Sequence, residues 1–438
     1  MFQNRKQISF DKGVKIEAGL VGFKHFSNSN TKYLISQGSC QSLAAASFGS
    51  QSISLNSKDN KRILELNLSE LTVEVEAGIT LRELDDYLFP KGFQIRCQPG
   101  HGLVTVGGAI AAETHGTNQY KFGSFSSQIR SLKLFHPDRG SFETSPLDHP
   151  EIFELTIGGF GLTGHIVSAV LDIRRINSVA RLNTARQIYS LKNYFEVMNE
   201  SAKLNEETHS WLRYNSKNKN LSGVIFSTNY VATKQSLSSV VNHFASASNL
   251  LRVPVNLWNA QTTALINQIY IKTYGFTFSS SYTTAARGYF LSTKSLFYYN
   301  LYGSNGFHEY SMIIDDSHLA YVLNLVHAKA RHLAIPVPLV STKPFIGDKK
   351  YLRFVGTGTC LTFNFPRNSR SEDLMKYCDD ILCDVKGIPS IIKDSRLPAW
   401  VVKKTFSEYD IFKSKIIKYD SSRRFRSELS ERLELDSY

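Results

Sequence analysis

Residues 98–118 form the part of the sequence whose composition points most directly to chemistry. Gly107 and Gly108 are followed by Ala109, Ala111 and Ala112, so this stretch has almost no side-chain bulk. A backbone without side chains can approach a ligand closely, and amide groups at the start of a short helix suit an anion such as a diphosphate. The same composition is also typical of a tight turn followed by a packed helix of small residues. On composition alone, this second interpretation is favoured.

A second glycine-rich motif has the spacing of a dinucleotide-binding fingerprint. Gly159, Gly161 and Gly164 follow the apolar residues 153–157. A nucleotide-binding βαβ unit would continue into a helix, whereas the apolar residues at 167–173 recur at every second position and predict a strand. The motif therefore disfavours an NAD site. The sequence also has no P-loop, no His-Glu-x-x-His zinc motif, no nucleophile elbow and no CxxC pair.

The elements that must position these motifs alternate between strand and helix patterns. Residues 63–66 and 71–76 alternate at period two and predict strands, and Thr80 is a candidate N-cap for the helix that follows. These patterns predict a mixed α+β domain over residues 1–176. A second domain is expected over residues 177–387, where the glycine-rich pattern fades and alternating runs such as 309–314 appear.

Length and composition bound the class of protein. A chain of 438 residues predicts two domains, and 42% hydrophobic with 20% charged residues is typical of a soluble globular protein. No apolar run of eighteen residues occurs, and residues 1–10 lack the apolar core of a secretory signal, so a cytoplasmic location is predicted. The five cysteines have neither metal nor disulfide spacing. We expect them to be reduced, with no metal site.

The formal charge of +13 would suit nucleic acid, an anionic membrane face or a phosphorylated substrate. The positive charge is densest at residues 403–426, where Glu428, Glu431 and Glu434 lie nearby. This pattern is most typical of a solvated helix face. No nucleic-acid-binding module is recognised in the sequence, so nucleic acid is not an expected partner.

Several blocks of the sequence resemble the FAD domain of the vanillyl-alcohol-oxidase (PCMH-type) flavoprotein family. The blocks are residues 105–118, 123–125, 130–131 and 158–164. A C-terminal block is also similar to members of this family: residues 393–396, then Arg424, Phe425 and residues 432–435. Weaker similarities lie at residues 302–303, 306–307, 343–345 and 363–366. The resemblance therefore extends over most of the chain.

The resemblance implies an α+β fold in which two subdomains clasp FAD, with a substrate (cap) domain built on an antiparallel sheet. Residues 388–438 are then expected to return to the FAD-binding domain. The implied cofactor-binding residues are Gly38, Ser39, Cys40, Gln41, Ser42, Pro99, Gly100, Thr105, Gly107, Gly108, Ala112, Gly116, Asn118, Gly123, Ser124, Gly161, Gly164 and Ile166. Gln41 stands where some members bond flavin to histidine, so FAD is expected to be held non-covalently. Cys40 stands where the family has glycine.

The resemblance also implies catalytic roles for Lys393 and His115. An ammonium near a flavin stabilises the negative charge that develops on reduction, and a histidine can accept the proton of a substrate hydroxyl. Without the resemblance, an ion pair of Lys393 with Asp394 and a structural role for His115 would be favoured. The implied substrate-binding residues are Tyr302, Lys343, Phe345 and Thr362. Thr117 and Ser390 stand where similar members carry lysine and tyrosine.

The function that the resemblance implies is FAD-dependent oxidation of a secondary hydroxyl on a sugar. The expected substrate is a glycosyl phosphate such as a polyprenyl-phosphate-linked pentose, and the keto sugar formed would pass to a partner reductase. Peripheral contact with the inner membrane face is compatible with such a substrate. The alternatives are an oxidase of free alditols or aldonolactones, a non-catalytic protein with a flavin-binding fold, and a basic surface-binding protein.

Overall fold

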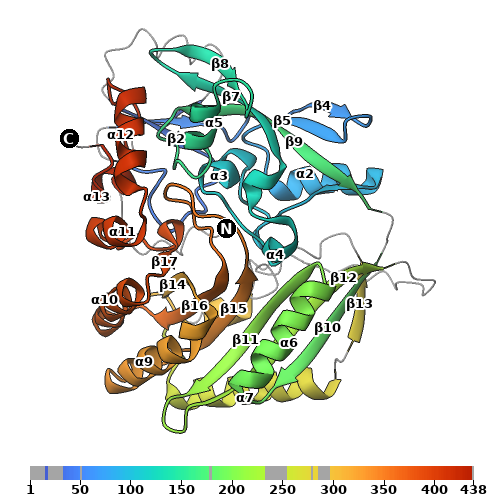
Figure 1. Cartoon of the computed structure of the whole chain (residues 1–438), viewed down its shortest axis with the longest axis vertical. Helices are drawn as coiled ribbons and strands as arrows, with labels where there is room; N and C mark the ends of the chain where they lie inside the picture. Colours follow the sequence, from blue (N-terminus) through green and yellow to red (C-terminus); the bar gives the residue numbers. More distant parts are fainter. Residues whose placement is uncertain are drawn as a thin grey trace.

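The computed structural model describes residues 15–17, 33–49, 52–176, 180–231, 254–277, 280–284 and 296–436. The predicted domain boundary at residue 177 and the N-terminal stretch 1–10 lie outside these residues. Figure 1 shows the first two sheets above, the large third sheet below, and the C-terminal helices along one side of both. The mixed α+β class that the sequence predicts is confirmed. The boundaries at 177 and 388 stay predictions.

A small parallel sheet carries the first loop of the site. Its strands lie in the order β1 (Lys15–Glu17), β3 (Ser52–Asn56) and β2 (Tyr33–Gln37). Leu34 of β2 also forms a parallel bridge with Phe425. Leu34, Leu55, Phe135 and Phe425 pack together as a small buried cluster, so this sheet depends on the C-terminal segment.

The second sheet is antiparallel and contains the strands that the sequence predicts. Its order is β4 (Ile63–Asn67), β5 (Thr72–Glu76), β9 (His165–Arg175), β7 (Ile129–His136) and β8 (Gly140–Thr144), with β6 (Phe93–Ile95) paired to β9. β9 begins directly after Gly164, as the alternating apolar residues predict. The glycine motif at 159–164 therefore leads into a strand and not into a helix.

Short helices cover this sheet and connect its strands. Thr80 caps α2 (Leu81–Leu88) as predicted, and Glu83 completes a capping box. Thr105 caps α3 (Val106–Ala111), and its hydroxyl accepts a hydrogen bond from Gly108 N. The other helical segments are η2 (Phe89–Lys91), α4 (Gln119–Phe122), η3 (Phe125–Gln128) and α5 (Pro150–Thr156).

The third sheet is the large antiparallel sheet of the second half of the chain. Its order is β13 (Ser280–Thr284), β10 (Ala180–Ile188), β12 (Asn220–Val231), β11 (Glu207–Asn215), β15 (Leu339–Phe345), β16 (Gly358–Pro366), β14 (Phe307–Ile314) and β17 (Ile388–Pro389). The same half of the chain contains the helical segments α8 (Leu296–Asn300), η6 (Asp316–His318), α9 (Leu319–His332) and α10 (Ser369–Asp384).

Helices α6 (Leu191–Leu204) and α7 (Ala260–Thr277) lie on opposite faces of this sheet. Tyr194 of α6 contacts Thr342 through their hydroxyls, at 2.7 Å. On the other face, Trp211 Nε1 donates to Asn267 Oδ1 of α7 at 2.9 Å. No described helix of the chain combines the length and apolar character that a membrane crossing requires.

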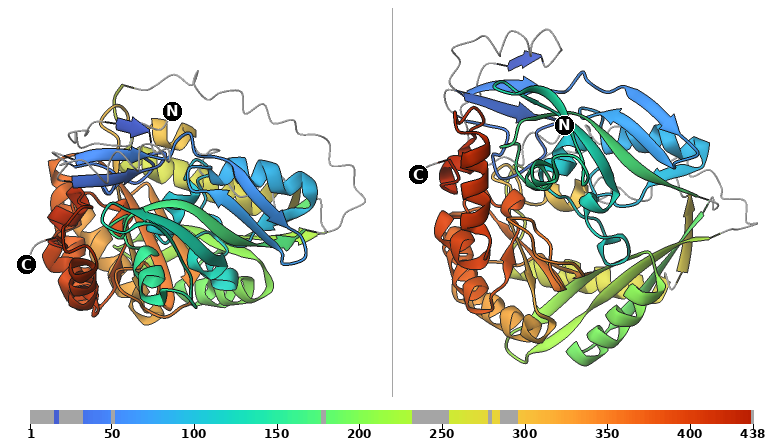
Figure 2. Two further views of the ribbon diagram at one scale, coloured as in Figure 1. Left: turned by 90° about the horizontal axis from the view of Figure 1, so that it is seen from above. Right: turned by 45° about the horizontal axis from the view of Figure 1, so that its top comes forward.

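The C-terminal segment contacts both halves of the molecule. It contains η7 (Ile391–Lys393), α11 (Ala399–Thr405), α12 (Tyr409–Tyr419) and α13 (Glu428–Arg432). Figure 2 shows these helices beside the first sheets in both views. Arg432 Nη2 donates to Ala44 O at 3.2 Å, and Arg426 N donates to Leu34 O at 3.1 Å. Glu428, Glu431 and Glu434 pair with Arg432, Arg426 and Lys403, respectively.

Candidate functional site

A cavity of about 410 Å³ lies where the N-terminal loop, the glycine-rich helix and the third sheet meet. Its volume is in the range of small-molecule and cofactor sites. The predicted cofactor residues that line it are Gly38, Ser39, Cys40, Gln41, Ser42, Pro99, Gly100, Thr105, Gly107, Gly108, Ala112, Gly161, Gly164 and Ile166. His115, Lys343 and Lys393 line the same cavity. The fold thus brings together residues separated by more than three hundred positions in sequence.

The loop after β2 presents free backbone amides to this cavity. Within the described chain, the amides of Ser39, Cys40, Gln41 and Ser42 donate no hydrogen bond. Cys40 has φ 56°, the left-handed conformation that glycine adopts most easily. Successive free amides around a left-handed residue form an anion-binding concavity. Cys40 therefore keeps the backbone conformation that glycine would allow at this position.

The glycine-rich helix contributes in a different way from the one its composition suggests. Gly107 N donates to Ala77 O at 2.8 Å, and Gly108 N donates to Thr105 Oγ1 at 3.1 Å. These two amides are therefore occupied by partners within the protein. Their missing side chains still matter, because the backbone of α3 forms a bare wall of the cavity. At Gly100, a Cβ atom would meet nothing within 4 Å.

Four predicted cofactor residues lie outside the cavity lining. Gly116 packs against backbone, because a Cβ atom there would lie 2.1 Å from Gln98 O. Asn118 Nδ2 donates to Arg96 O at 2.7 Å. Gly123, at φ 75°, ends α4, and Ser124 precedes η3. In this structure these residues shape the turn that follows His115.

His115 is buried, and its ring lies against Phe345 and Phe354, with centroid distances of 4.9 and 5.3 Å. Its Nδ1 atom is buried without a hydrogen-bond partner among the described residues. Burial, followed by the positive charges of Lys343 and Lys393, holds the pKa of His115 well below its ordinary value. The imidazole is therefore neutral near pH 7 and is able to accept a proton.

Lys393 forms an ion pair inside the cavity. Its Nζ atom lies 2.8 Å from Glu309 Oε1 and donates to Ser311 Oγ at 3.4 Å. The alternative of an ion pair with Asp394 is wrong, because Asp394 pairs with Arg396 at 2.7 Å. Burial alone would lower the pKa of Lys393, but the carboxylate of Glu309 outweighs it, and the pKa is raised.

Lys343 has a different environment. It lines the cavity, and no carboxylate in the described part of the chain lies within ion-pair distance of it. Burial, followed by repulsion from Lys393, lowers the pKa of Lys343. The cavity thus holds one paired and one unpaired lysine.

The other predicted substrate residues lie one layer behind the cavity wall. Phe345 packs on His115, Tyr302 packs on Phe307 with a centroid distance of 5.0 Å, and the Thr362 hydroxyl lies 2.8 Å from that of Ser311. Residues that line the cavity and were not predicted include Glu309, Tyr299, Phe307, His165 and Ile392. The only sequence signal for Glu309 is an acidic residue near the start of an apolar strand.

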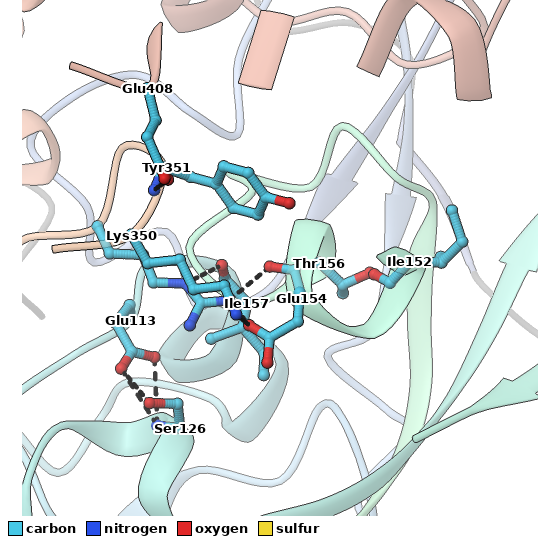
Figure 3. A network of polar contacts seen from close by, with 10 residues as sticks. Glu113, Ser126, Ile152, Glu154, Thr156, Ile157, Lys350, Tyr351 and Glu408 are labelled. Carbon is cyan, nitrogen blue, oxygen red and sulfur yellow. Dashed lines mark hydrogen bonds and ion pairs between the residues drawn. The ribbon is translucent and has the colours of Figure 1, made fainter. Parts of the chain in front are cut away.

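The loop between β15 and β16, residues 346–357, holds the His115 turn against the rest of the protein. Gln119 exchanges two hydrogen bonds with the backbone of Ile346, at 2.8 and 3.0 Å. Arg353 is buried and donates to Ile157 O at 2.9 Å and to Glu154 O and Oε2 at 2.5 and 2.6 Å. Figure 3 shows Glu154, Ile157 and Lys350 gathered at this contact, with Glu113 and Ser126 close by.

The loop 346–357 and its contacts, which we call the clasp, also reach the C-terminal segment. Tyr351 N donates to Glu408 Oε2 at 2.6 Å (Figure 3). Glu113, two residues before His115, accepts from Ser126 N and Oγ, at 3.2 and 2.5 Å. Burial raises the pKa of Glu113 to about 6, although Arg353 counteracts this effect. The loop 346–357 thus contacts the His115 turn through Gln119, the end of α5 through Arg353 and the C-terminal segment through Tyr351.

Comparison with known proteins identifies the first part of the chain. Residues 23–145 match the model of the FAD binding domain family. The chain is 34% identical over 113 residues to decaprenylphosphoryl-β-D-ribose oxidase of Mycolicibacterium smegmatis, covering 26% of this chain and 25% of that protein. It is 33% identical over 82 residues to the mitochondrial D-lactate dehydrogenase [cytochrome] 1 of Saccharomyces cerevisiae, covering 19% of this chain and 14% of that protein.

A third relative is the mitochondrial L-galactono-1,4-lactone dehydrogenase of Arabidopsis thaliana, 28% identical over 143 residues, or 33% of this chain and 22% of that protein. In each case the match covers a quarter or less of the relative's own length. The geometry of the cavity fits FAD, because free amides suited to a phosphate lie on one wall and buried polar atoms of Thr114 and His115 lack partners among the described residues. Residues 23–145 therefore match an FAD binding domain, and the chain binds FAD.

Proposed function

We propose that this protein is an FAD-dependent oxidoreductase that oxidises a secondary hydroxyl of a sugar, with a glycosyl phosphate as the substrate class. The observation that carries the proposal is the meeting of His115, Lys343 and Lys393 in the cavity lined by the FAD binding domain. FAD, held without a covalent bond, would supply the hydride acceptor. The chain's own residues would supply the proton acceptor and the charges.

In this proposal His115 acts as the base. Its imidazole is neutral because of burial and the two nearby lysines, and Nδ1 has no partner among the described residues. A neutral imidazole within reach of a hydroxyl accepts its proton as the C–H bond breaks. Phe345 and Phe354 hold the ring in place and exclude water from this side.

The lysines would have separate tasks. Lys393 is held by Glu309 and would stabilise negative charge as it develops in the cavity. Lys343 has no carboxylate partner among the described residues, so its charge is available to a phosphate on the substrate. Because no carboxylate among the described residues forms an ion pair with Lys343, a glycosyl phosphate is favoured over a neutral alditol or aldonolactone.

The purified, flavin-containing protein is mixed without oxygen with glycosyl phosphates and, separately, with free alditols and aldonolactones, while flavin bleaching is followed. Bleaching by the phosphorylated sugars supports the proposal, and bleaching by the free sugars alone supports the alternative substrate class. Lys393→Ala should retain flavin and slow bleaching by about two to three orders of magnitude. Lys403→Ala removes an exposed lysine that pairs with Glu434 and should bleach at the wild-type rate. A Lys393→Ala variant as fast as this control would overturn the role of Lys393.

A further inference from the structure

Glu309 is a carboxylate in the wall of the cofactor cavity, and both of its oxygens are held by other side chains. Lys393 Nζ lies 2.8 Å from Oε1, and Asn364 Nδ2 donates to Oε2 at 3.2 Å. Tyr298 donates to Asn364 Oδ1 at 3.3 Å, and its hydroxyl lies 2.5 Å from that of Tyr302. The carboxylate is therefore fixed by a chain of polar side chains that leads away from the cavity.

Neighbouring strands supply this arrangement. Glu309 and Asn364 are direct cross-strand partners in β14 and β16, and Ser311 follows two residues later on the same face as Glu309. Lys393 lies on η7, which closely follows β17 in the sequence, and β17 pairs with β14. β14 therefore offers Lys393 two acceptors, one charged and one neutral, that fix the direction of its side chain.

We propose that Glu309 is a positioning residue that keeps Lys393 protonated and directed into the cofactor cavity. Two half-buried lysines in one cavity repel each other, and loss of solvent disfavours the charged form of both. Glu309 contacts one of the two, so it selects Lys393 as the ammonium that persists. The inference rests on the proposed function, because it assigns Glu309 a role through Lys393.

Titration of Lys393 is governed by groups on several elements. The groups that face it are Glu309 and Ser311 on β14, Lys343 on β15, Cys360 on β16, Tyr299 on α8 and His115 after α3. Of these, Glu309 is the carboxylate. The attraction of Glu309 raises the pKa of Lys393 in spite of burial, whereas Lys343, without such a partner, has a lowered pKa.

The test is the midpoint potential of the bound flavin, measured from pH 6 to pH 10 in the wild type and in Glu309→Gln at matched flavin occupancy. Deprotonation of a lysine that stabilises the reduced flavin produces a break in the dependence of potential on pH. Because the pKa of Lys393 is raised above its ordinary value, the wild type should show no break up to pH 10. Removal of an opposite charge in contact shifts a pKa by about 1–3 units, so Glu309→Gln should show a break within the measured range. A Glu309→Gln protein without a break up to pH 10, or a wild type with the same break, would overturn the inference.

Two further variants separate the possible failures. Ser311→Ala removes the neutral partner of Lys393 and, like the wild type, should show no break up to pH 10. Adding Lys393→Met to Glu309→Gln should abolish the break. If the break persists in this double variant, the proposed role of Lys393 fails, whereas a break that depends on Lys393 but is already present in the wild type refutes only this inference. Should Glu309→Gln not fold, Glu309→Asp replaces it, and its break should lie at higher pH than that of a protein without the carboxylate.

Discussion

Arg353 offers a sharp test of how the clasp supports the site. Its guanidinium donates to Ile157 O at 2.9 Å and to both the carbonyl and the carboxylate of Glu154, and its side chain is only 8% exposed. Arg353→Met keeps most of the side-chain volume and leaves the Ile157 carbonyl without this donor. Removal of one partner of a buried ion pair costs about 3–5 kcal/mol. Because Glu154 is partly exposed, we expect the lower end, about 3 kcal/mol.

The measurement is urea unfolding followed by tryptophan fluorescence, with wild type and variant compared at pH 7. Lys350→Met is the matched control, since Lys350 pairs with the same carboxylate at 2.9 Å but is exposed to solvent. An exposed pair contributes at most about 1 kcal/mol. If Arg353→Met lowered the free energy of unfolding by no more than Lys350→Met does, the clasp would not stabilise the structure in the way described.

Three other predictions follow from the site. Burial raises the pKa of Glu113 from 4.5 to about 6, so its stabilising contribution is complete below pH 4.5 and is lost as pH rises through 6. Glu113→Gln should therefore be more stable than the wild type by about 2 kcal/mol in urea unfolding at pH 7, and this difference should vanish near pH 4.5. A stability difference between the two proteins that is the same at pH 7 and pH 4.5 would contradict this. Cys40→Gly should retain FAD, whereas Cys40→Val, forced to the same left-handed backbone, should lose it and be destabilised by about 1–2 kcal/mol, as release of flavin fluorescence and urea unfolding would show. His115→Gln should keep flavin but slow its reduction by substrate about 10²–10⁴-fold. In the wild type, the rate of flavin reduction should not fall with a midpoint near pH 6.5, because the imidazole is already neutral there. A fall in rate at that pH would refute the lowered pKa of His115.

Local patterns predicted much of the first half of the fold correctly. Alternation at period two identified β4, β5 and β9, and Thr80 was recognised as the cap of α2. These features depend on neighbours within a few residues, so they can be read from the sequence. The strand after Gly164 also separated this fold from a βαβ nucleotide site.

The site itself was only partly predictable. The glycine-rich stretch marked the cavity wall formed by residues 99–112, and the family resemblance marked residues 38–42. Neither showed that the amides of Gly107 and Gly108 are already occupied by Ala77 and Thr105. Glu309 and Arg353 were missed because their partners lie on other segments of the chain, 84 and 196 to 199 residues away. Pairing between segments that are far apart in the sequence is a property of the assembled fold and leaves no local pattern.

The dependence of the N-terminal loop on the C-terminal segment has a consequence for biosynthesis. Leu43 N donates to Ile392 O at 3.2 Å, Leu34 N donates to Arg424 O at 2.6 Å, and Ala44 O accepts from Arg432. While the chain is still on the ribosome, residues 33–47 emerge long before these partners exist. The wall that carries the free amides is thus completed only after residue 432 has left the exit tunnel, so the cofactor is enclosed only once that residue has been translated. Until then, one side of the cavity beside the first sheets is open to solvent, and its apolar surface is accessible to chaperones.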